Sequence, residues 1–349
     1  WGQLDQPGDA ASHKQHGRIV PSTGGIGIFL TIALPITLAL IAVHLVPMDA
    51  YSGWLAPVKQ HVPGLRSQSV MGFAIVGAML VLQIMGLIDA RRRLGPYSKL
   101  MVQVIVAAVL AGVFDVRVLH LLDACGALGR VASIAISVIW IVTIINAINF
   151  LDNMDGLSAG VSAVIAAIYL AATLIGGQWF VAALAALLLG ALAAFLVFNF
   201  PPARVFMGDG GSLVVGLLLA VISVRTTYFT APASDLSAGV GEAGHWYGLL
   251  MPLVIMAVPL YDITSVTLIR LSQGKSPFYP DQQHFSHRLV KKGLSKRTAV
   301  IVIWLCTLAT GLGGVMLGRL EGWQAALVAV QTVAVIAVLA LLERTKATK

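Results

Sequence analysis

Charged residues are scarce in this chain. Aspartate, glutamate, lysine and arginine make up 11% of the 349 residues, roughly half of what a soluble domain usually carries. Cysteine is scarcer still: Cys125 and Cys306 are far apart and lie outside any metal-ligand pattern, so a disulfide framework is excluded. The net charge of +8 comes with no basic, aromatic-laced soluble segment, and we therefore expect no nucleic-acid binding.

Hydrophobic residues are abundant instead, at 58%, and the mean hydropathy is +0.88. Apolar stretches of about 20 residues recur, long enough to cross a hydrocarbon core of roughly 30 Å. Continuous runs of this kind favour helices, so the sequence predicts an all-α polytopic membrane protein with a single integral-membrane domain over residues 1–349. Ten spans are predicted, at 24–46, 69–88, 100–114, 131–149, 157–176, 179–198, 211–230, 247–269, 298–318 and 323–342.

The distribution of basic residues predicts the orientation of these spans. Of the 23 lysines and arginines, 17 fall in the segments on one side of the membrane and 5 on the other. The basic side should be cytoplasmic, in a plasma (inner) membrane, where it also faces anionic lipid headgroups. Because the sequence starts at Trp1 without a methionine and residues 1–22 are polar, we expect a further segment upstream, such as another span.

Residues capable of chemistry gather on the predicted cytoplasmic side. Asp152 and Asp155, with Asn149, are spaced three apart and would share one helical face, which suits a divalent cation or sugar and base hydroxyls. The alternative is a polar helix end closed by Gly156. Of the two charges inside spans, Asp262 is expected to line the same cytoplasmic cavity, whereas Arg225 lies toward the far side.

A glycine-rich segment, FMGDGGS, precedes the seventh span. Its glycines permit close approach of backbone to a ligand, and the helix N-terminus that follows suits an anion. Asp209 in this segment is a candidate Mg²⁺ ligand, with Mn²⁺ as a substitute, because Mg²⁺ takes one or two carboxylates plus phosphate oxygens. The alternative is a turn in which Asp209 is only an N-cap.

The cytoplasmic loop 270–297 is basic and contains His284 and His287. No cysteine accompanies these histidines, which argues against zinc and leaves phosphate contact as a function for them. A solvated loop that merely follows the positive-inside rule is the alternative, and it is the better interpretation of the lysines.

Together these features suit a reaction between a soluble phosphorylated donor and a membrane-embedded acceptor. Two unit charges about 4 Å apart repel by about 4 kcal/mol at an effective dielectric near 20, so approaching phosphates need a metal and cationic side chains. A transporter or channel is the alternative from another class. It predicts polar residues in both membrane halves, whereas here they cluster on one side.

Six stretches resemble the polyprenyl-phosphate N-acetylhexosamine-1-phosphate transferases of glycosyltransferase family 4, in family order between residues 13 and 300. They are HKQHGRIVPSTGGIGIF, GLIDARRRLGPYSKL, NAINFLDNMDGLSAG, FNFPPARVFMGDGGSLVVG, PLYDITSV and HFSHRLVKKG. The chain is more similar to the undecaprenyl-phosphate N-acetylglucosaminyl-1-phosphate transferase branch than to the related phospho-MurNAc-pentapeptide translocase. That branch has one more span before the first loop.

The resemblance implies that polyprenyl (undecaprenyl) phosphate attacks a UDP-N-acetylhexosamine, chiefly UDP-N-acetylglucosamine, releasing UMP and starting a cell-envelope glycan. It implies catalytic roles for Asp89 at the lipid phosphate, for Asp152 and Asp155 at the nucleotide–sugar end, and for His284 and His287 at phosphates, with Asp209 as the Mg²⁺ ligand. Substrate contacts are implied for Asn149, Asn199, Phe206, Arg288, Lys14 and His16. A homodimer is among the assemblies left open.

Two positions depart from the family pattern. Ala90 follows Asp89 where a second aspartate is usual, and Ser286 stands where a histidine is usual. Neighbouring residues in a helix point in different directions, so Asp89 can act without its neighbour. The departures keep a third alternative open, a catalytically impaired relative that binds UDP-sugar or lipid.

Overall fold

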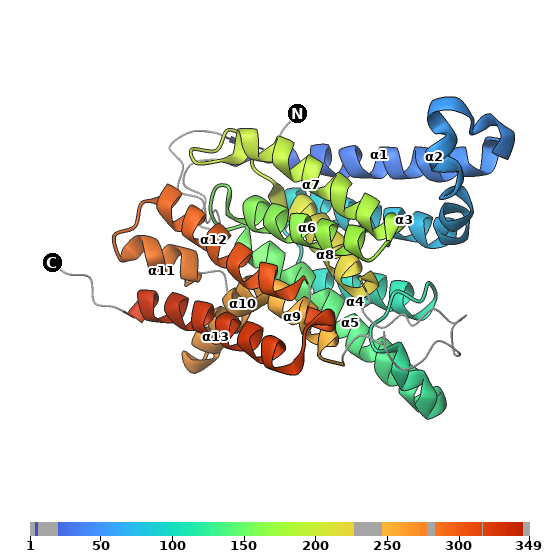
Figure 1. The fold of residues 1–349 in the computed structure, drawn as a ribbon. Helices are drawn as coiled ribbons and strands as arrows, with labels where there is room; N and C mark the ends of the chain where they lie inside the picture. The colour runs from blue at the N-terminus through green and yellow to red at the C-terminus, as the bar shows by residue number, and fades with distance from the viewer. Residues whose placement is uncertain (1–3, 6–19, 227–245, 278–282, 316, 345–349) are drawn as a thin grey trace.

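A computed structural model describes residues 4–5, 20–226, 246–277, 283–315 and 317–344 (Figure 1). Lys14 and His16 lie outside these residues. Helices dominate the described chain. The strands are two short segments, β1 (Leu4–Asp5) and β2 (Val20–Pro21), which pair antiparallel in front of the first long helix.

Within the described residues, eight helices are long and apolar enough to cross a membrane. They are α1 (Gly24–Leu45), α3 (Val62–Arg92), α5 (Gly126–Leu151), α6 (Leu157–Ile175), α7 (Trp179–Asn199), α8 (Gly208–Arg225), α12 (Lys296–Gly314) and α13 (Gly322–Arg344). A shorter apolar helix, α4 (Pro96–Gly112), occupies the third predicted span. The all-α, multi-pass prediction is thereby confirmed, and each of the ten predicted spans corresponds to helical structure.

Three of the differences from the predicted boundaries affect the course of the chain. The second span is the 31-residue α3, which extends beyond 69–88 at both ends. The eighth is broken: α9 (Met251–Ile255) and α10 (Ala257–Ser272) form a pair bent by 68°. The seventh ends at Arg225, since Thr226 leaves helical geometry; residues 227–230 lie outside the described chain.

The connections contain short helices. They are α2 (Ala56–Lys59), α11 (Phe285–Lys291) and the 3₁₀ turns η1 (Met48–Ala50), η2 (Gly53–Leu55), η3 (His120–Cys125), η4 (Trp246–Leu250) and η5 (Leu317–Arg319). Before η3, Arg117 is buried and pairs with Asp115 and Asp123. The hydrogen bonds that Arg117 donates to the Asp123 carboxylate raise the pKa of Arg117 above its ordinary value, so this ion pair between α4 and α5 stays charged.

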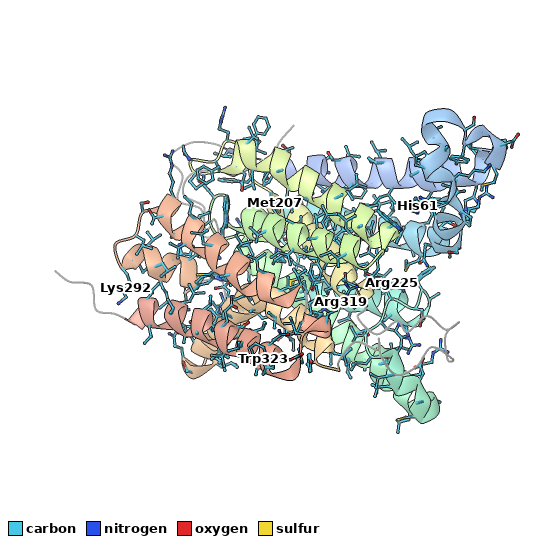
Figure 2. The ribbon with its side chains drawn as sticks, in the orientation of Figure 1. His61, Met207, Arg225, Lys292, Arg319 and Trp323 are labelled. Carbon is cyan, nitrogen blue, oxygen red and sulfur yellow. The ribbon has the colours of Figure 1, made fainter. Side chains whose placement is uncertain are left out.

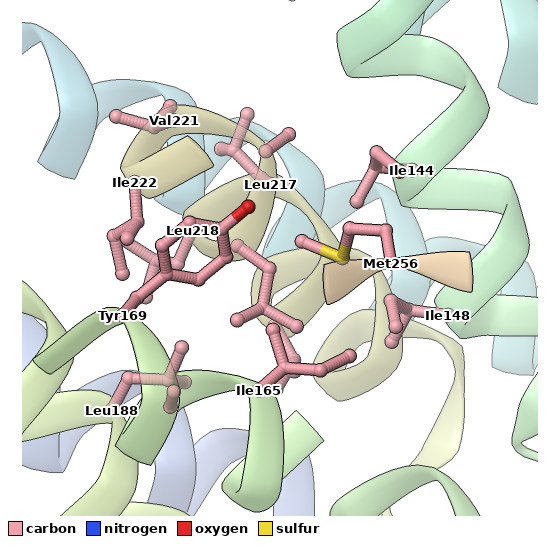
Figure 3. Packing of buried hydrophobic residues seen from close by; sticks show 14 of the residues in the cluster. Ile144, Ile148, Ile165, Tyr169, Leu188, Leu217, Leu218, Val221, Ile222 and Met256 are labelled. Carbon is pink, nitrogen blue, oxygen red and sulfur yellow. The ribbon is translucent and has the colours of Figure 1, made fainter. Parts of the chain in front are cut away.

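Helix α8 is the centre of the bundle. Every residue from Gly210 to Val224 is buried, because the sequence is apolar on all sides and α1, α3, α5, α6 and α7 surround it. Figure 3 shows its side chains in contact with three neighbouring helices and with the break between α9 and α10. The labelled residues are Leu217, Leu218, Val221 and Ile222 of α8, Ile144 and Ile148 of α5, Ile165 and Tyr169 of α6, Leu188 of α7, and Met256.

The start of α8 packs backbone to backbone against α1 and α3. A Cβ added to Gly86 of α3 would lie 2.2 Å from the Cα of Gly210, and one on Gly25 of α1 would lie 2.5 Å from the backbone nitrogen of Gly211. Small residues at such positions let membrane helices approach closely. Gly210 and Gly211 are therefore explained by helix packing, which corrects the sequence-based reason given for them.

The outermost helix is α13, whose span is only 6% buried. Its exposed apolar residues include Leu327, Val330 and Val333, which would face lipid. Lys292 and His61 lie at opposite ends of the bundle (Figure 2). Helix α8 runs along the same axis, with Met207 toward the end of Lys292 and Arg225 toward the other end. The end near Lys292 carries residues 149–156, 199–209 and 284–288, and is called the site end below (Figure 1). Asp89 belongs to this end because Lys99 joins it to Asp209.

Candidate active site

One lysine joins two of the predicted carboxylates at the site end. The ammonium of Lys99, in the first turn of α4, contacts Asp89 of α3 and lies 2.9 Å from Oδ2 of Asp209 in the first turn of α8. The other oxygen of Asp89 accepts a hydrogen bond of 2.6 Å from the backbone of Leu94, which fixes the turn between α3 and α4. Asp89 and Asp209 are thus brought together as expected of one site.

Lys99 was not predicted as a site residue. The signal for it was available: a lysine one turn into an apolar helix, in a stretch already singled out for Asp89. Its two acidic neighbours neutralise its charge, which stabilises an ammonium at this partly buried position.

The donor set fits Mg²⁺, although no group of three or more His, Cys, Asp or Glu side chains in the described chain is close enough to enclose a metal. Mg²⁺ usually takes one or two carboxylates and fills its remaining positions with water and substrate phosphates. Asp89 and Asp209 converge on one cationic group, and the Asp209 side chain is 43% exposed. A divalent ion could therefore reach Asp209 from solvent.

Below Asp209, amide side chains join α4, α5 and α8. Asn149 donates to the Ser212 hydroxyl at 2.8 Å, and that hydroxyl donates to the backbone carbonyl of Asp209 at 3.1 Å. One turn earlier, Asn146 donates to Gln103 of α4 at 2.5 Å. The predicted substrate contact Asn149 therefore lies beside the Asp209 turn and supports its backbone.

Asn149, Asp152 and Asp155 do not share one helical face, contrary to the prediction. Helix α5 ends at Leu151, Asp152 is its C-cap, and the chain turns until α6 begins. Gly156 takes φ of +71° in that turn, a conformation that glycine adopts easily. The half-buried Asp152 stays at the helix end, whereas the turn carries Asp155 inward to 4% exposure.

Asp155 and Asn199 shape the loop between α7 and α8. Oδ2 of Asp155 accepts a hydrogen bond of 3.0 Å from the backbone of Ala203. The Asn199 amide accepts from Gly156 N at 2.9 Å and donates to the carbonyl of Val205 at 2.8 Å. Both side chains hold backbone together, so a substrate contact by Asn199 would compete with two hydrogen bonds inside the protein.

Phe206 is 2% exposed and packs with Val20 and Ala203. Its backbone nitrogen donates to Pro21 at 2.8 Å, and its carbonyl accepts from Gly24 N at 3.0 Å, at the start of α1. Stacking of the Phe206 ring on uracil, as the resemblance implies, requires this cover to open.

His284 is held by an aspartate from the broken span. Its Nδ1 lies 2.9 Å from Oδ2 of Asp262, which is fully buried in α10, and Oδ1 of Asp262 accepts from Phe285 N at 3.2 Å. The Phe150 ring meets the His284 ring edge to face at 5.8 Å. Asp262 therefore supports the histidine-bearing segment, in line with its expected place on this side.

Helix α11 also docks on the turn that contains the carboxylates. The Ser286 hydroxyl, fully buried, donates to Oδ1 of Asn153 at 2.7 Å, and Asn153 in turn donates to the carbonyl of Phe150 at 2.7 Å. Serine at position 286 thus has a packing role of its own. His287 lies on the same helix and is half-buried.

Arg288 points into the protein. It bonds the carbonyl of Gln283 at 2.7 Å and the hydroxyl of Ser265 at 3.1 Å, and it pairs with Glu343 of α13 at 2.8 Å. Glu343 was not singled out in the sequence, where it is one acidic residue near the end of an apolar run. In sum, Asp89, Asp209 and Asn149 form one group, and His284, His287 and Arg288 form another. The turn after Asn149 connects them, because Phe150 contacts His284 and Asn153 bonds Ser286.

The fold and the site are those of a multi-pass membrane protein. Two carboxylates paired by a lysine, and a histidine bonded to a buried aspartate, lie at one end of it. The profile of glycosyl transferase family 4 matches residues 72–227, a stretch that contains Asp89, Lys99, Asn149 and Asp209. Over that stretch, which is less than half of the 349 residues, the chain is similar to glycosyl transferase family 4.

A probable undecaprenyl-phosphate N-acetylglucosaminyl 1-phosphate transferase of Bacillus subtilis is 28% identical over 329 residues, which cover 92% of this chain and 79% of that relative. A decaprenyl-phosphate N-acetylglucosaminephosphotransferase of Mycobacterium tuberculosis is 37% identical over 128 residues, 36% of this chain and 30% of the relative. An undecaprenyl-phosphate alpha-N-acetylglucosaminyl 1-phosphate transferase of Escherichia coli is 34% identical over 114 residues, 32% of this chain and 27% of the relative. The last two matches span about a third or less of those relatives.

Proposed function

We propose that this protein transfers N-acetylglucosamine 1-phosphate from a UDP-sugar to polyprenyl phosphate. An oxygen of the polyprenyl phosphate forms a bond to the β-phosphorus of the donor, and the bond from that phosphorus to the bridging oxygen breaks. The products are polyprenyl-diphospho-sugar and UMP. The names of the relatives support the transferred group and the acceptor class, and the UDP form of the donor is our own extension.

The observation that carries the proposal is the Asp89–Lys99–Asp209 group at the site end. Asp209, with Asp89, would hold Mg²⁺, which supplies neutralising charge to the donor diphosphate. Lys99 adds a cation that the protein itself positions. Asp152, at the neighbouring helix end, is the carboxylate we assign to the nucleotide–sugar portion.

His284 can act on a phosphate through its outer ring nitrogen. Because Nδ1 lies against the Asp262 carboxylate, the proton belongs on Nδ1 in the neutral ring, and Nε2 remains for substrate. In the protonated ring Nε2 is a hydrogen-bond donor. A strong base on the acceptor is not required, since a phosphate monoester with a second pKa of about 6 is mostly ionised at neutral pH.

We place the reaction on the cytoplasmic face of the plasma membrane. The basic residues that predict orientation are concentrated at the same end as the Asp89–Lys99–Asp209 group and α11. This side would also bring a water-soluble nucleotide sugar and a membrane-anchored phosphate to one boundary.

The test is UMP release by detergent-purified protein with undecaprenyl phosphate and UDP-N-acetylglucosamine, in Mg²⁺, Mn²⁺ or EDTA. Metal-dependent and lipid-dependent UMP is expected. Asp209→Asn should abolish it while the protein stays folded, and Asp49→Asn, at an exposed site in η1, is the matched control. A folded wild type that binds UDP-N-acetylglucosamine without releasing UMP would instead indicate the catalytically impaired relative.

A further inference from the structure

Arg288 follows His287 directly and would be expected to grip a phosphate, but its bonds point elsewhere. Nη1 donates to the carbonyl of Gln283, and Nη2 donates to Ser265 and to the Glu343 carboxylate. Nε is buried and has no hydrogen-bond partner among the residues that the structure describes. A fork-like grip on a phosphate needs two neighbouring N–H groups directed at it. Both terminal nitrogens here are committed to the protein.

Glu343 is built into the contact between three helices. Its side chain is 9% exposed, near the end of α13. Oε2 pairs with Arg288 of α11 at 2.8 Å, and Oε1 accepts from the hydroxyl of Tyr261 in α10 at 3.2 Å. The Tyr261 ring also meets Phe285 edge to face at 6.0 Å. The last helix of the chain is thereby tied to the first turn of α11.

The same first turn carries His284 and Ser286. Asp262, next to Tyr261 in α10, holds His284, and Asn153 holds Ser286. Three attachments therefore set the position of α11: Asp262 to His284, Asn153 to Ser286, and Glu343 to Arg288. Among the described residues, the Arg288–Glu343 ion pair is the only one of the three that involves α13. A buried carboxylate beside Arg288 also opposes the approach of an anionic donor to that guanidinium.

We propose that Glu343 is a positioning residue for this site. Its ion pair with Arg288 fixes the position of α11, and therefore also the position of the His284 ring. Arg288 then has a structural role and is not a phosphate ligand. This inference rests on the proposed function where it concerns kinetics. Its structural part, that the pair holds α11 in place, does not depend on the reaction.

A double-mutant cycle tests the pair, with Glu343→Gln, Arg288→Gln and the double variant. Amide hydrogen exchange of residues 285–291 is measured by mass spectrometry on the detergent-purified full chain. We expect exchange about tenfold faster in each single variant, and no further increase in the double variant, because either change removes the same contact. Glu321→Gln, at the exposed start of the same helix, is the control and should leave α11 unchanged.

Enzyme kinetics distinguish a structural role of Arg288 from a role as a phosphate ligand. All three variants should lower kcat by about tenfold, with the KM for UDP-N-acetylglucosamine changed by less than about threefold, because only the placement of His284 is affected. A tenfold or larger rise in donor KM in Arg288→Gln alone, with Glu343→Gln tightening the donor, would identify Arg288 as a phosphate ligand and overturn the inference. Unchanged exchange in all three variants would overturn it as well.

A charge-reversed variant, Arg288→Glu with Glu343→Arg, covers the case in which the neutral variants fail to fold. Recovery of slow exchange relative to Arg288→Glu alone is expected from an ion pair, whereas a phosphate ligand cannot be restored in this way. If the wild type releases no UMP, the proposed function fails, but the exchange results still decide whether the pair fixes α11.

Discussion

Replacing Lys99 with methionine removes the cation between Asp89 and Asp209 and keeps most of the side-chain volume. Both carboxylates contact the same ammonium, so they lie within about 5 to 6 Å of one another. At an effective dielectric near 20, two like charges about 5 Å apart repel by about 3 kcal/mol. The Asp209 side chain is 43% exposed, and solvent screening reduces this to a destabilisation of about 1 kcal/mol.

A loss of that size should lower the apparent melting temperature by about 2–4 °C in EDTA. Mg²⁺ should then restore it, because two carboxylates without their lysine attract a divalent ion more strongly, and a ligand that binds only the folded state stabilises it. The melting temperature of Lys99→Met should therefore rise more on addition of Mg²⁺ than that of the wild type.

The assay is thermal unfolding in detergent, followed by intrinsic fluorescence, with Mg²⁺ titrated against a fixed protein concentration. Lys59→Met, at an exposed lysine in α2, is the control for loss of a positive charge. Equal melting temperatures and equal Mg²⁺ responses in Lys99→Met and the wild type would refute the view that Lys99 neutralises both carboxylates and so weakens their attraction for a metal.

Three further substitutions probe the frame of the site. Gly86→Ala should destabilise the protein by more than about 2 kcal/mol because its Cβ would meet the backbone of Gly210. Gly77→Ala in the same helix has open space and should be neutral or stabilising by about 0.5–1 kcal/mol. Equal melting temperatures of the two variants would contradict the close packing. Asn199→Ala leaves two backbone groups without their bonds and should cost about 2–4 kcal/mol in thermal unfolding, and a loss below about 0.5 kcal/mol would show that water replaces the amide. Ser286→Ala should cost about 1–2 kcal/mol and speed proteolysis near α11, so unchanged cleavage would argue against this attachment.

Much of the fold follows from local signals. Continuous apolar runs specify each span within the run itself, so the ten segments could be predicted without knowledge of their neighbours. The bend between α9 and α10 was not predicted, because the apolar run continues without interruption across Met256, where the helix breaks. Asp89 and Asp209 could be assigned to one side from the alternation of spans.

The contacts of the site depend on distant residues. Lys99 and Asp209 are 110 residues apart, and Ser286 and Asn153 are 133 apart, so no periodicity in the sequence connects them. Asp155 has the spacing of a helical pair, but the helix ends four residues earlier. Local pattern therefore predicted that these polar residues share one end of the bundle, and tertiary contacts decided which of them face one another.

The glycine contacts at the start of α8 bear on how this protein could be altered. Gly25, Gly86, Gly210 and Gly211 leave no volume for a side chain, so the turn that carries Asp209 is held at fixed distances from α1 and α3. Laboratory evolution toward another sugar donor would find almost no tolerated change at these four positions. New specificity would have to arise in the surrounding loops, such as residues 200–207, while the turn that carries Asp209 stays constant.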